Sequence, residues 1–204
     1  MDGVSDEPRA EVSILISDNK ITGIEDGFVS GSDNTQIIDL SNKTVLPGLI
    51  DLHVHLESET NPKKYMEQFT FDEADFAFRS TAYAKRTLMA GFTTVRELGG
   101  WGVEIPPSVM PSTRDLWTGP RVISVGKSIA TTGGHADPTN GWKQDLMGNP
   151  GPREGVINGE DEARQAVRQR YQDRSRSVLR SPQPVVFCRV LPNREMPRNF
   201  SWMK

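Results

Sequence analysis

Residues 44–56 read Thr-Val-Leu-Pro-Gly-Leu-Ile-Asp-Leu-His-Val-His-Leu, an apolar run that closes on two histidines, His53 and His55. Residues i and i+2 of a strand point to the same face, so a strand with this ending places two imidazoles side by side. Imidazole is a common zinc ligand, and a rigid strand limits the entropy lost on metal binding. The run therefore predicts half of a metal site, because such sites usually need three or more ligands. The competing interpretation is a chance His-x-His pair on a solvated strand edge.

The chain after Pro47-Gly48 alternates between strand and helix patterns. Leu49 to Leu56 is almost wholly apolar, which is typical of a strand buried on both sides. Residues 72–90 contain no Pro or Gly and predict a helix that ends at Gly91. The other expected elements are strands over residues 92–98 and 121–124 and a helix over residues 159–171. A strand-helix-strand order is the repeat of a parallel α/β barrel.

The first 46 residues predict a small antiparallel β-unit. Residues 11–16 alternate apolar and polar side chains, and residues 17–20 supply a turn before a second strand at residues 21–24. Residues 35–40 and 43–46 repeat the strand character.

Size, charge and cysteine content set limits on the chain. Its 204 residues are fewer than the roughly 250 of a complete eight-stranded α/β barrel. The net charge of −3 is unevenly distributed along the chain, because residues 174–204 carry a net charge of +6 and the residues before them carry −9. The single cysteine, Cys188, excludes an internal disulfide. The acidic N-terminus and the lack of a run of about 18 apolar residues predict a cytoplasmic protein, as the sequence stands.

Four segments resemble the amidohydrolase superfamily in the same order. They are the run ending in His53-Val54-His55, Ala-Gly-Phe-Thr-Thr-Val-Arg-Glu at 90–97, Gly-Pro-Arg-Val at 119–122 and Thr-Thr-Gly-Gly-His-Ala-Asp at 131–137. Together they are similar to the branch with imidazolonepropionase-like enzymes and metal-dependent Xaa-Pro or Xaa-Arg dipeptidases, over about residues 2–173. The resemblance implies an α/β fold: about the first three strands of a TIM-like (β/α)8 barrel in residues 47–173, preceded by part of a small β-sandwich in residues 1–46.

The resemblance implies a metal-dependent hydrolase of C–N bonds, in which metal-bound hydroxide attacks an amide or dipeptide carbonyl. It assigns His53 and His55 as ligands of one or two divalent ions, with zinc as the expected metal. It assigns His135 as a contact of the substrate carboxylate or carbonyl. A surface histidine that is hydrogen-bonded within its own loop is the competing interpretation of His135.

Three carboxylates near these segments are expected to play supporting roles. Asp51 precedes the histidines and is expected to support them or to cap the strand. Glu97 is expected to form a salt bridge with Arg96 inside the barrel instead of taking part in catalysis. Asp137 is expected to support His135 within its loop.

Residues 174–204 break the family pattern. The family's fourth barrel strand resembles Ile-Lys-Ile-Thr-Ala-Thr-Gly-Gly-Val-Leu, whose lysine bridges the metals, whereas Pro182 and Pro184 argue against a central strand here. An allowed codon choice for Leu179–Cys188, read from the third base of the first codon, encodes Lys-Ile-Thr-Ala-Thr-Gly-Gly-Val-Leu. We therefore hypothesise that residues 174–204 are a basic tail outside the family, translated out of frame. The alternative is a native disordered tail that binds nucleic acid or acidic surfaces.

These features predict a truncated metal-dependent hydrolase without appreciable activity, because only two family metal ligands remain. One alternative is a small metal-binding or regulatory protein with a basic tail, and another is a cyclic-amide or imidazolone hydrolase. We expect a small-molecule or dipeptide substrate, no nucleic-acid or membrane partner, and homo-oligomers or aggregation through open sheet edges. An intact homologue with a signal peptide would be periplasmic or secreted.

Overall fold

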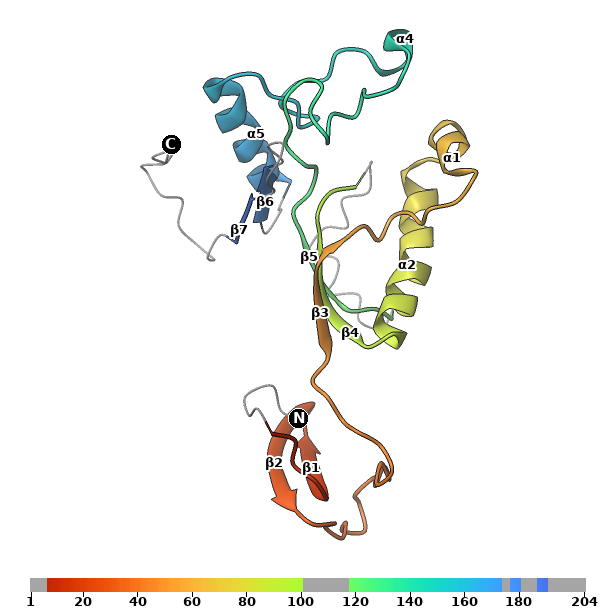
Figure 1. The fold of residues 1–204 in the computed structure, drawn as a ribbon, viewed down its shortest axis with the longest axis vertical. Helices are drawn as coiled ribbons and strands as arrows, with labels where there is room; N and C mark the ends of the chain where they lie inside the picture. Colours follow the sequence, from red (N-terminus) through yellow and green to blue (C-terminus); the bar gives the residue numbers. More distant parts are fainter. Residues whose placement is uncertain (1–6, 101–117, 174–176, 181–186, 191–204) are drawn as a thin grey trace. The chain divides into compact units, whose positions relative to one another are not determined.

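The computed structural model describes residues 7–100, 118–173, 177–180 and 187–190, and it divides into two compact units, residues 1–48 and 49–204. In the first unit, β1 (Val12–Ser17) and β2 (Lys20–Asp26) form an antiparallel hairpin (Figure 1). The turn residues Asp18 and Asn19 have φ angles of 50° and 61°, the left-handed conformation that a two-residue hairpin turn requires and that Asp and Asn tolerate. The predicted hairpin is confirmed.

The other two strands predicted in this unit are not formed. Residues 35–40 and 43–46 are irregular, and Ile37, Ile38 and Leu46 are exposed. Branched apolar side chains favour an extended backbone, but a strand also needs a partner, and among the described strands β1 and β2 pair only with each other. The prediction of part of a β-sandwich is therefore not confirmed beyond this hairpin.

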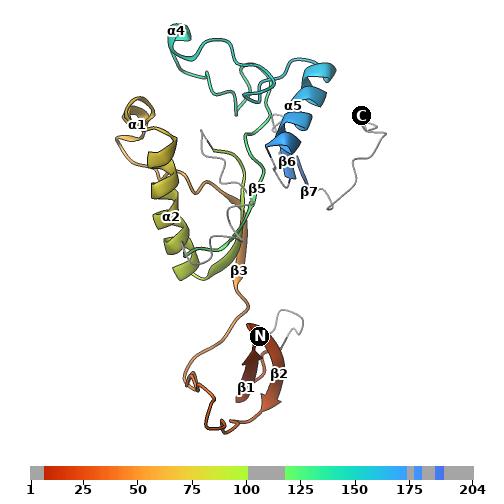
Figure 2. The same cartoon turned by 180° about the vertical axis from the view of Figure 1, so that it is seen from behind.

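The second unit is built on a three-stranded parallel sheet in the order β3-β4-β5. Its strands are β3 (Leu49–Val54), β4 (Phe92–Glu97) and β5 (Arg121–Ser124). Between β3 and β4 the chain forms α1 (Lys64–Thr70) and α2 (Glu73–Met89), and α2 lies along one side of the sheet in both views (Figures 1 and 2). The α/β class and the strand-helix-strand order are confirmed. Within the described residues the sheet has three strands and does not close into a barrel.

Local signals define α2 at both ends. The Asp72 carboxylate accepts hydrogen bonds from the backbone amides of Ala74 (2.9 Å) and Asp75 (3.3 Å), and the Asp75 carboxylate accepts one from the Asp72 amide (3.0 Å). This reciprocal pair satisfies amides that a helix N-terminus otherwise leaves free. At the other end Gly91 has φ of 99°, which glycine adopts without strain. The helix predicted over residues 72–90 is confirmed.

The apolar core of this unit is small. Ala84 of α2 packs with Leu56, Val95 and Val122 on the side of the sheet that the helix covers. A second cluster joins Ile129 and Ile157 to Ala163 and Ala166 of α5 (Glu160–Gln172), which confirms the helix predicted over residues 159–171.

One prediction for β3 is wrong. Leu49, Ile50 and Leu52 are 48%, 63% and 53% exposed, although the composition of the strand predicts burial on both sides. Among the described residues β3 pairs only with β4, so it is an edge strand. An almost wholly apolar strand is typical of a position with neighbours on both sides, and the second neighbour is not among the described strands.

Past α5 the described chain does not extend the parallel sheet. β6 (Ser177–Arg180) and β7 (Phe187–Val190) pair with each other as an antiparallel hairpin. Pro182 and Pro184 lie outside the described residues. None of the described helices has the length and apolar character needed to cross a bilayer.

Candidate metal centre

The two histidines lie at the C-terminal end of β3. His53 is within the strand and His55 follows it directly. Their ring centroids are 5.4 Å apart with an edge-on angle of 78°, and both side chains are exposed. The side-by-side placement expected from the i, i+2 spacing is therefore present. Because β3, β4 and β5 are parallel, their C-terminal ends lie at the same end of the sheet. The segments that follow β4 and β5 therefore start at the same end of the sheet as the histidines.

Hydrogen bonds fix which ring nitrogen of His55 is available. Its Nδ1 lies 2.8 Å from the carbonyl oxygen of Gly99 and 3.3 Å from Oε1 of Glu97. Both partners are acceptors, so Nδ1 donates a proton and the neutral ring keeps its lone pair on Nε2. A metal-binding histidine commonly has this arrangement, with its second nitrogen donating to a carbonyl or carboxylate.

Glu97 is the buried carboxylate of this site. Its side chain is 5% exposed, and its Oε2 accepts a hydrogen bond from the Leu56 amide at 2.5 Å. The hydrogen bond from His55 to Glu97 raises the pKa of His55, opposed by burial, which lowers it. Arg96 points to the opposite face of β4, where its Nε donates to the Leu52 carbonyl at 2.7 Å. The predicted salt bridge between Arg96 and Glu97 is therefore wrong, because neighbouring strand residues face opposite ways.

Asp51 acts on the strand backbone. Its Oδ1 accepts a hydrogen bond from the His53 amide at 2.9 Å. This contact holds the backbone that carries His53, in line with the supporting role expected from the sequence.

His135 is exposed on the long segment that follows β5. The nearby Asp137 is only 6% exposed, and its carboxylate accepts hydrogen bonds from the Gly133 amide (2.7 Å), the Thr139 amide (2.8 Å) and the Thr139 hydroxyl (2.7 Å). Burial raises the pKa of Asp137, but these hydrogen bonds outweigh it and hold the pKa below its ordinary value. Asp137 therefore supports the loop backbone on both sides of His135.

The metal-binding donors in the described part of the chain are incomplete. No three His, Cys, Asp or Glu side chains gather there as a metal site would need. His53 and His55 come together, whereas His135 does not join them in such a group. Two imidazoles on one strand face, one with a free Nε2, fit two positions around a zinc-type ion. A complete centre would need at least one more donor.

Two features of this region were missed in the sequence. One is the contact of Glu97 with His55, which depends on how β4 lies against β3. The other is α1, where Tyr65 stacks on Trp142 of the segment after β5 (centroids 4.4 Å apart, planes at 6°) and Phe69 meets the same ring edge-on at 5.3 Å. Two aromatic residues four positions apart are a helical signal that predicts α1.

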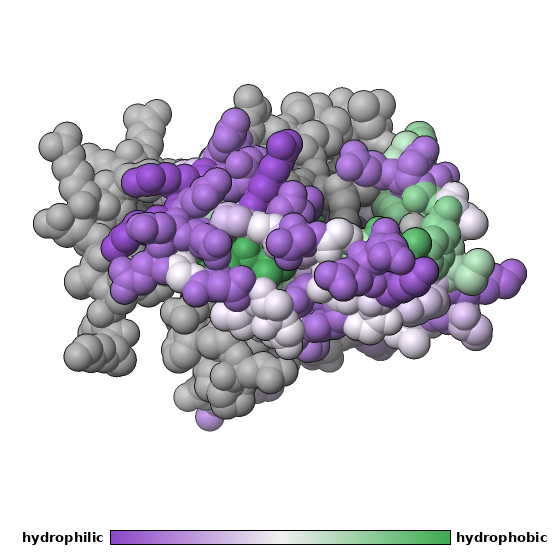
Figure 3. Space-filling view, turned by 90° about the horizontal axis from the view of Figure 1, so that it is seen from above, coloured by the Kyte–Doolittle hydropathy of each residue, from purple (hydrophilic) through white to green (hydrophobic). Residues whose placement is uncertain are grey.

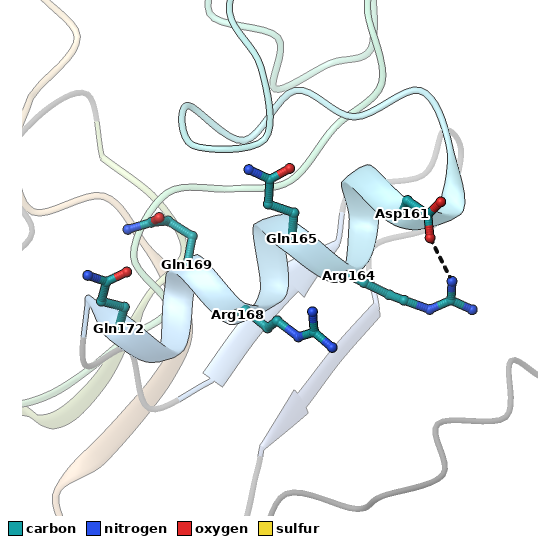
Figure 4. A pocket seen from close by; sticks show the side chains of 6 residues that line it. All are labelled: Asp161, Arg164, Gln165, Arg168, Gln169 and Gln172. Carbon is teal, nitrogen blue, oxygen red and sulfur yellow. Dashed lines mark hydrogen bonds and ion pairs between the residues drawn. The ribbon is translucent and has the colours of Figure 1, made fainter.

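A separate hollow lies along α5. It is lined by Asp161, Arg164, Gln165, Arg168, Gln169 and Gln172. Figure 4 shows these side chains on the helix, with Arg164 paired to Asp161 at 3.0 Å. All six are polar and none is His or Cys, so the hollow has the character of a solvated helix face. Among the residues coloured in Figure 3, hydrophilic side chains predominate, with small apolar patches.

Known proteins resemble this chain over most of its length. A family model described as the amidohydrolase family matches residues 44–198. A solved Xaa-Pro dipeptidase with bound methionine in its active site is 41% identical with a TM-score of 0.78, over 87% of this chain and 44% of that one. A solved prolidase complexed with N-methylphosphonate-L-proline is 29% identical with a TM-score of 0.58, over 79% and 39%. Ochratoxinase of Aspergillus niger is 27% identical over 183 residues, 79% of this chain and 36% of that protein.

The chain thus spans less than half the length of these three relatives. The family-model match also runs through residues 174–198, so it marks no boundary at residue 173.

Proposed function

Because the chain belongs to the amidohydrolase family, we propose that its residues form part of a metal-dependent hydrolase that cleaves C–N bonds in amides or dipeptides. Similarity to a Xaa-Pro dipeptidase and a prolidase supports the dipeptide class. The observation that carries the proposal is the contact of His55, whose Nδ1 lies 2.8 Å from the Gly99 carbonyl oxygen and so leaves the lone pair of the neutral ring on Nε2, with the ring centroid of His53 5.4 Å away.

In this proposal His53 and His55 are metal ligands, and zinc is the metal that their chemistry suits. A bound divalent ion would make water a nucleophile near neutral pH and would polarise the scissile carbonyl. The chain's own contribution is to hold two imidazoles on one face of β3, with Asp51 and Gly99 fixing the backbone and the ring.

His135 is proposed as a contact of the substrate carboxylate or carbonyl. Its side chain is exposed, and it lies on the segment that follows the C-terminal end of β5. In parallel α/β barrels these segments carry the active site. The buried Asp137 holds the loop that presents His135.

The 204-residue polypeptide alone is proposed to have no appreciable turnover. The chain has three histidines and two of them pair, so two imidazoles must hold the metal without a third described donor. Two ligands rarely hold a catalytic zinc ion while keeping an open position in a controlled geometry.

Calorimetric titration with zinc tests the ligand assignment. We expect weak binding that is lost in His53→Ala and in His55→Ala and is unchanged in His135→Ala, which serves as the matched control. Zinc affinity that survives both substitutions in β3 would overturn the assignment. Zinc-dependent hydrolysis of a dipeptide by the purified chain would overturn the proposed inactivity.

A further inference from the structure

We propose that Glu97 is a positioning residue that holds His55 in the tautomer and orientation needed for metal binding. The inference rests on the proposed function, because it takes His55 as a metal ligand. It gives a role to Glu97 of β4, for which the sequence predicts a salt bridge with Arg96.

The pairing of two strands places Glu97 beside His55. Glu97 is the last residue of β4 and lies opposite Val54, the last residue of β3. The Leu98 amide donates to the Val54 carbonyl at 3.2 Å, so the strands stay paired up to the residue that precedes His55. The Glu97 side chain therefore starts from a fixed point next to the chain that leaves β3.

The Glu97 carboxylate contacts both the ring and the backbone around His55. Oε2 accepts a hydrogen bond from the Leu56 amide at 2.5 Å, and Oε1 lies 3.3 Å from Nδ1 of His55. The first contact fixes the backbone directly after the histidine. The second contact places a negatively charged oxygen next to Nδ1 of His55. A hydrogen bond between the two atoms forms only when Nδ1 carries the proton.

The environment of Oε1 argues against a purely structural role. This oxygen is buried, and apart from Nδ1 of His55 at 3.3 Å it has no hydrogen-bond partner within the described part of the chain. Burying an unsatisfied carboxylate oxygen is unfavourable for folding, and Arg96 points away from it. The imidazole of His55 is the group that faces it, so orientation of that ring explains why a carboxylate stands here.

Gly99 supplies the second acceptor. Its φ of 121° is a conformation that other residues rarely adopt, and an added Cβ would collide with Oγ of Ser128. This backbone brings the Gly99 carbonyl to 2.8 Å from Nδ1 of His55. Glu97 and Gly99 thus approach the same nitrogen, Nδ1, and leave Nε2 for a metal. This is the usual arrangement in which a carboxylate accepts from one ring nitrogen of a histidine and the other nitrogen binds the metal.

The test compares Glu97→Gln with Glu59→Gln in the full chain. A glutamine keeps one acceptor for the Leu56 amide but presents an NH2 donor, in place of a carboxylate oxygen, to Nδ1. Glu59 lies in the same segment after β3, is exposed and pairs with Arg86 at 2.8 Å, so it is a matched loss of charge outside the ring contact.

Nitrogen-15 NMR of the histidine rings in the metal-free chain gives the first readout. We expect neutral His55 to be protonated on Nδ1, and its Nε2-protonated fraction to rise in Glu97→Gln but not in Glu59→Gln. Zinc titration gives the second readout, with affinity weakened about 10- to 100-fold in Glu97→Gln and unchanged in Glu59→Gln.

Neutral His55 protonated on Nε2 in the unsubstituted chain would overturn the inference, and that measurement needs no variant to fold. So would a folded Glu97→Gln chain with unchanged ring protonation and zinc affinity. Zinc binding that does not depend on His53 and His55 refutes the proposed function itself, and Glu97 is then left without a positioning role.

Discussion

Replacement of Asp137 by alanine should release the loop that carries His135. The carboxylate is buried and accepts three hydrogen bonds, from the amide of Gly133 and from the amide and hydroxyl of Thr139. Alanine removes the acceptor and leaves these donors without a partner. Asp145→Ala is the matched control, because that carboxylate lies in the same segment, is 79% exposed and pairs only with Lys143 among the described residues.

The size of the effect follows from the contacts. A hydrogen bond to a charged group contributes about 1.5–3 kcal/mol, but three bonds to one carboxylate are not additive. We therefore expect Asp137→Ala to reduce the local stability of the loop by about 3 kcal/mol, and Asp145→Ala by about 0.5 kcal/mol or less. Since about 1.4 kcal/mol is a factor of ten, opening of the loop should become roughly 100-fold more frequent.

Amide hydrogen exchange at Gly133 and Thr139 measures this opening directly. The same amides report the pH dependence, because the pKa of Asp137 is lowered in the folded chain. A lowered pKa means that the carboxylate contributes its full stabilisation above the ordinary aspartate value of about 3.9 and loses it as pH falls through the folded value. The protection advantage of the unsubstituted chain over Asp137→Ala should therefore be constant near neutral pH and shrink under acid conditions. Equal exchange in Asp137→Ala and Asp145→Ala would show that the Asp137 carboxylate does not hold the loop.

Three further outcomes follow from the same structure. Gly99→Ala should destabilise the chain and shift the His55 ring resonances, because the new Cβ meets Ser128, and unchanged resonances would contradict the contact with the Gly99 carbonyl. Asp72→Ala should lower the free energy of unfolding by about 1 kcal/mol in urea denaturation, because it removes the cap of α2, and an unchanged midpoint would show that the cap contributes nothing. The coding DNA around codon 174 should continue, in a shifted frame, as recognisable amidohydrolase sequence, and the out-of-frame hypothesis is abandoned if it does not.

Local patterns predicted the elements that local interactions define. The helix α2 follows from the absence of Pro and Gly over residues 72–90 and from Gly91 at its end, and the structure adds the local pair of Asp72 and Asp75 at its start. The side-by-side histidines follow from the two-residue period of β3. These features need no knowledge of the rest of the chain.

Non-local features were harder to predict. The strands expected at residues 35–40 and 43–46 need a partner backbone, which their own composition does not encode. The contact between Glu97 and His55 spans more than 40 residues and depends on the register of β4 against β3. The exposure of β3 is also a non-local feature, because it depends on whether another strand pairs with the side of β3 that does not face β4.

A zinc titration followed through the ring nitrogens of all three histidines tests whether His53 and His55 bind one metal ion together. We expect the signals of His53 and His55 to shift together at the same zinc concentrations, with His55 affected at Nε2, while His135 is unchanged. A shift at His135 that accompanies only one of the other two, or no shift at His53 and His55 in the folded chain, would contradict a metal centre at the end of β3.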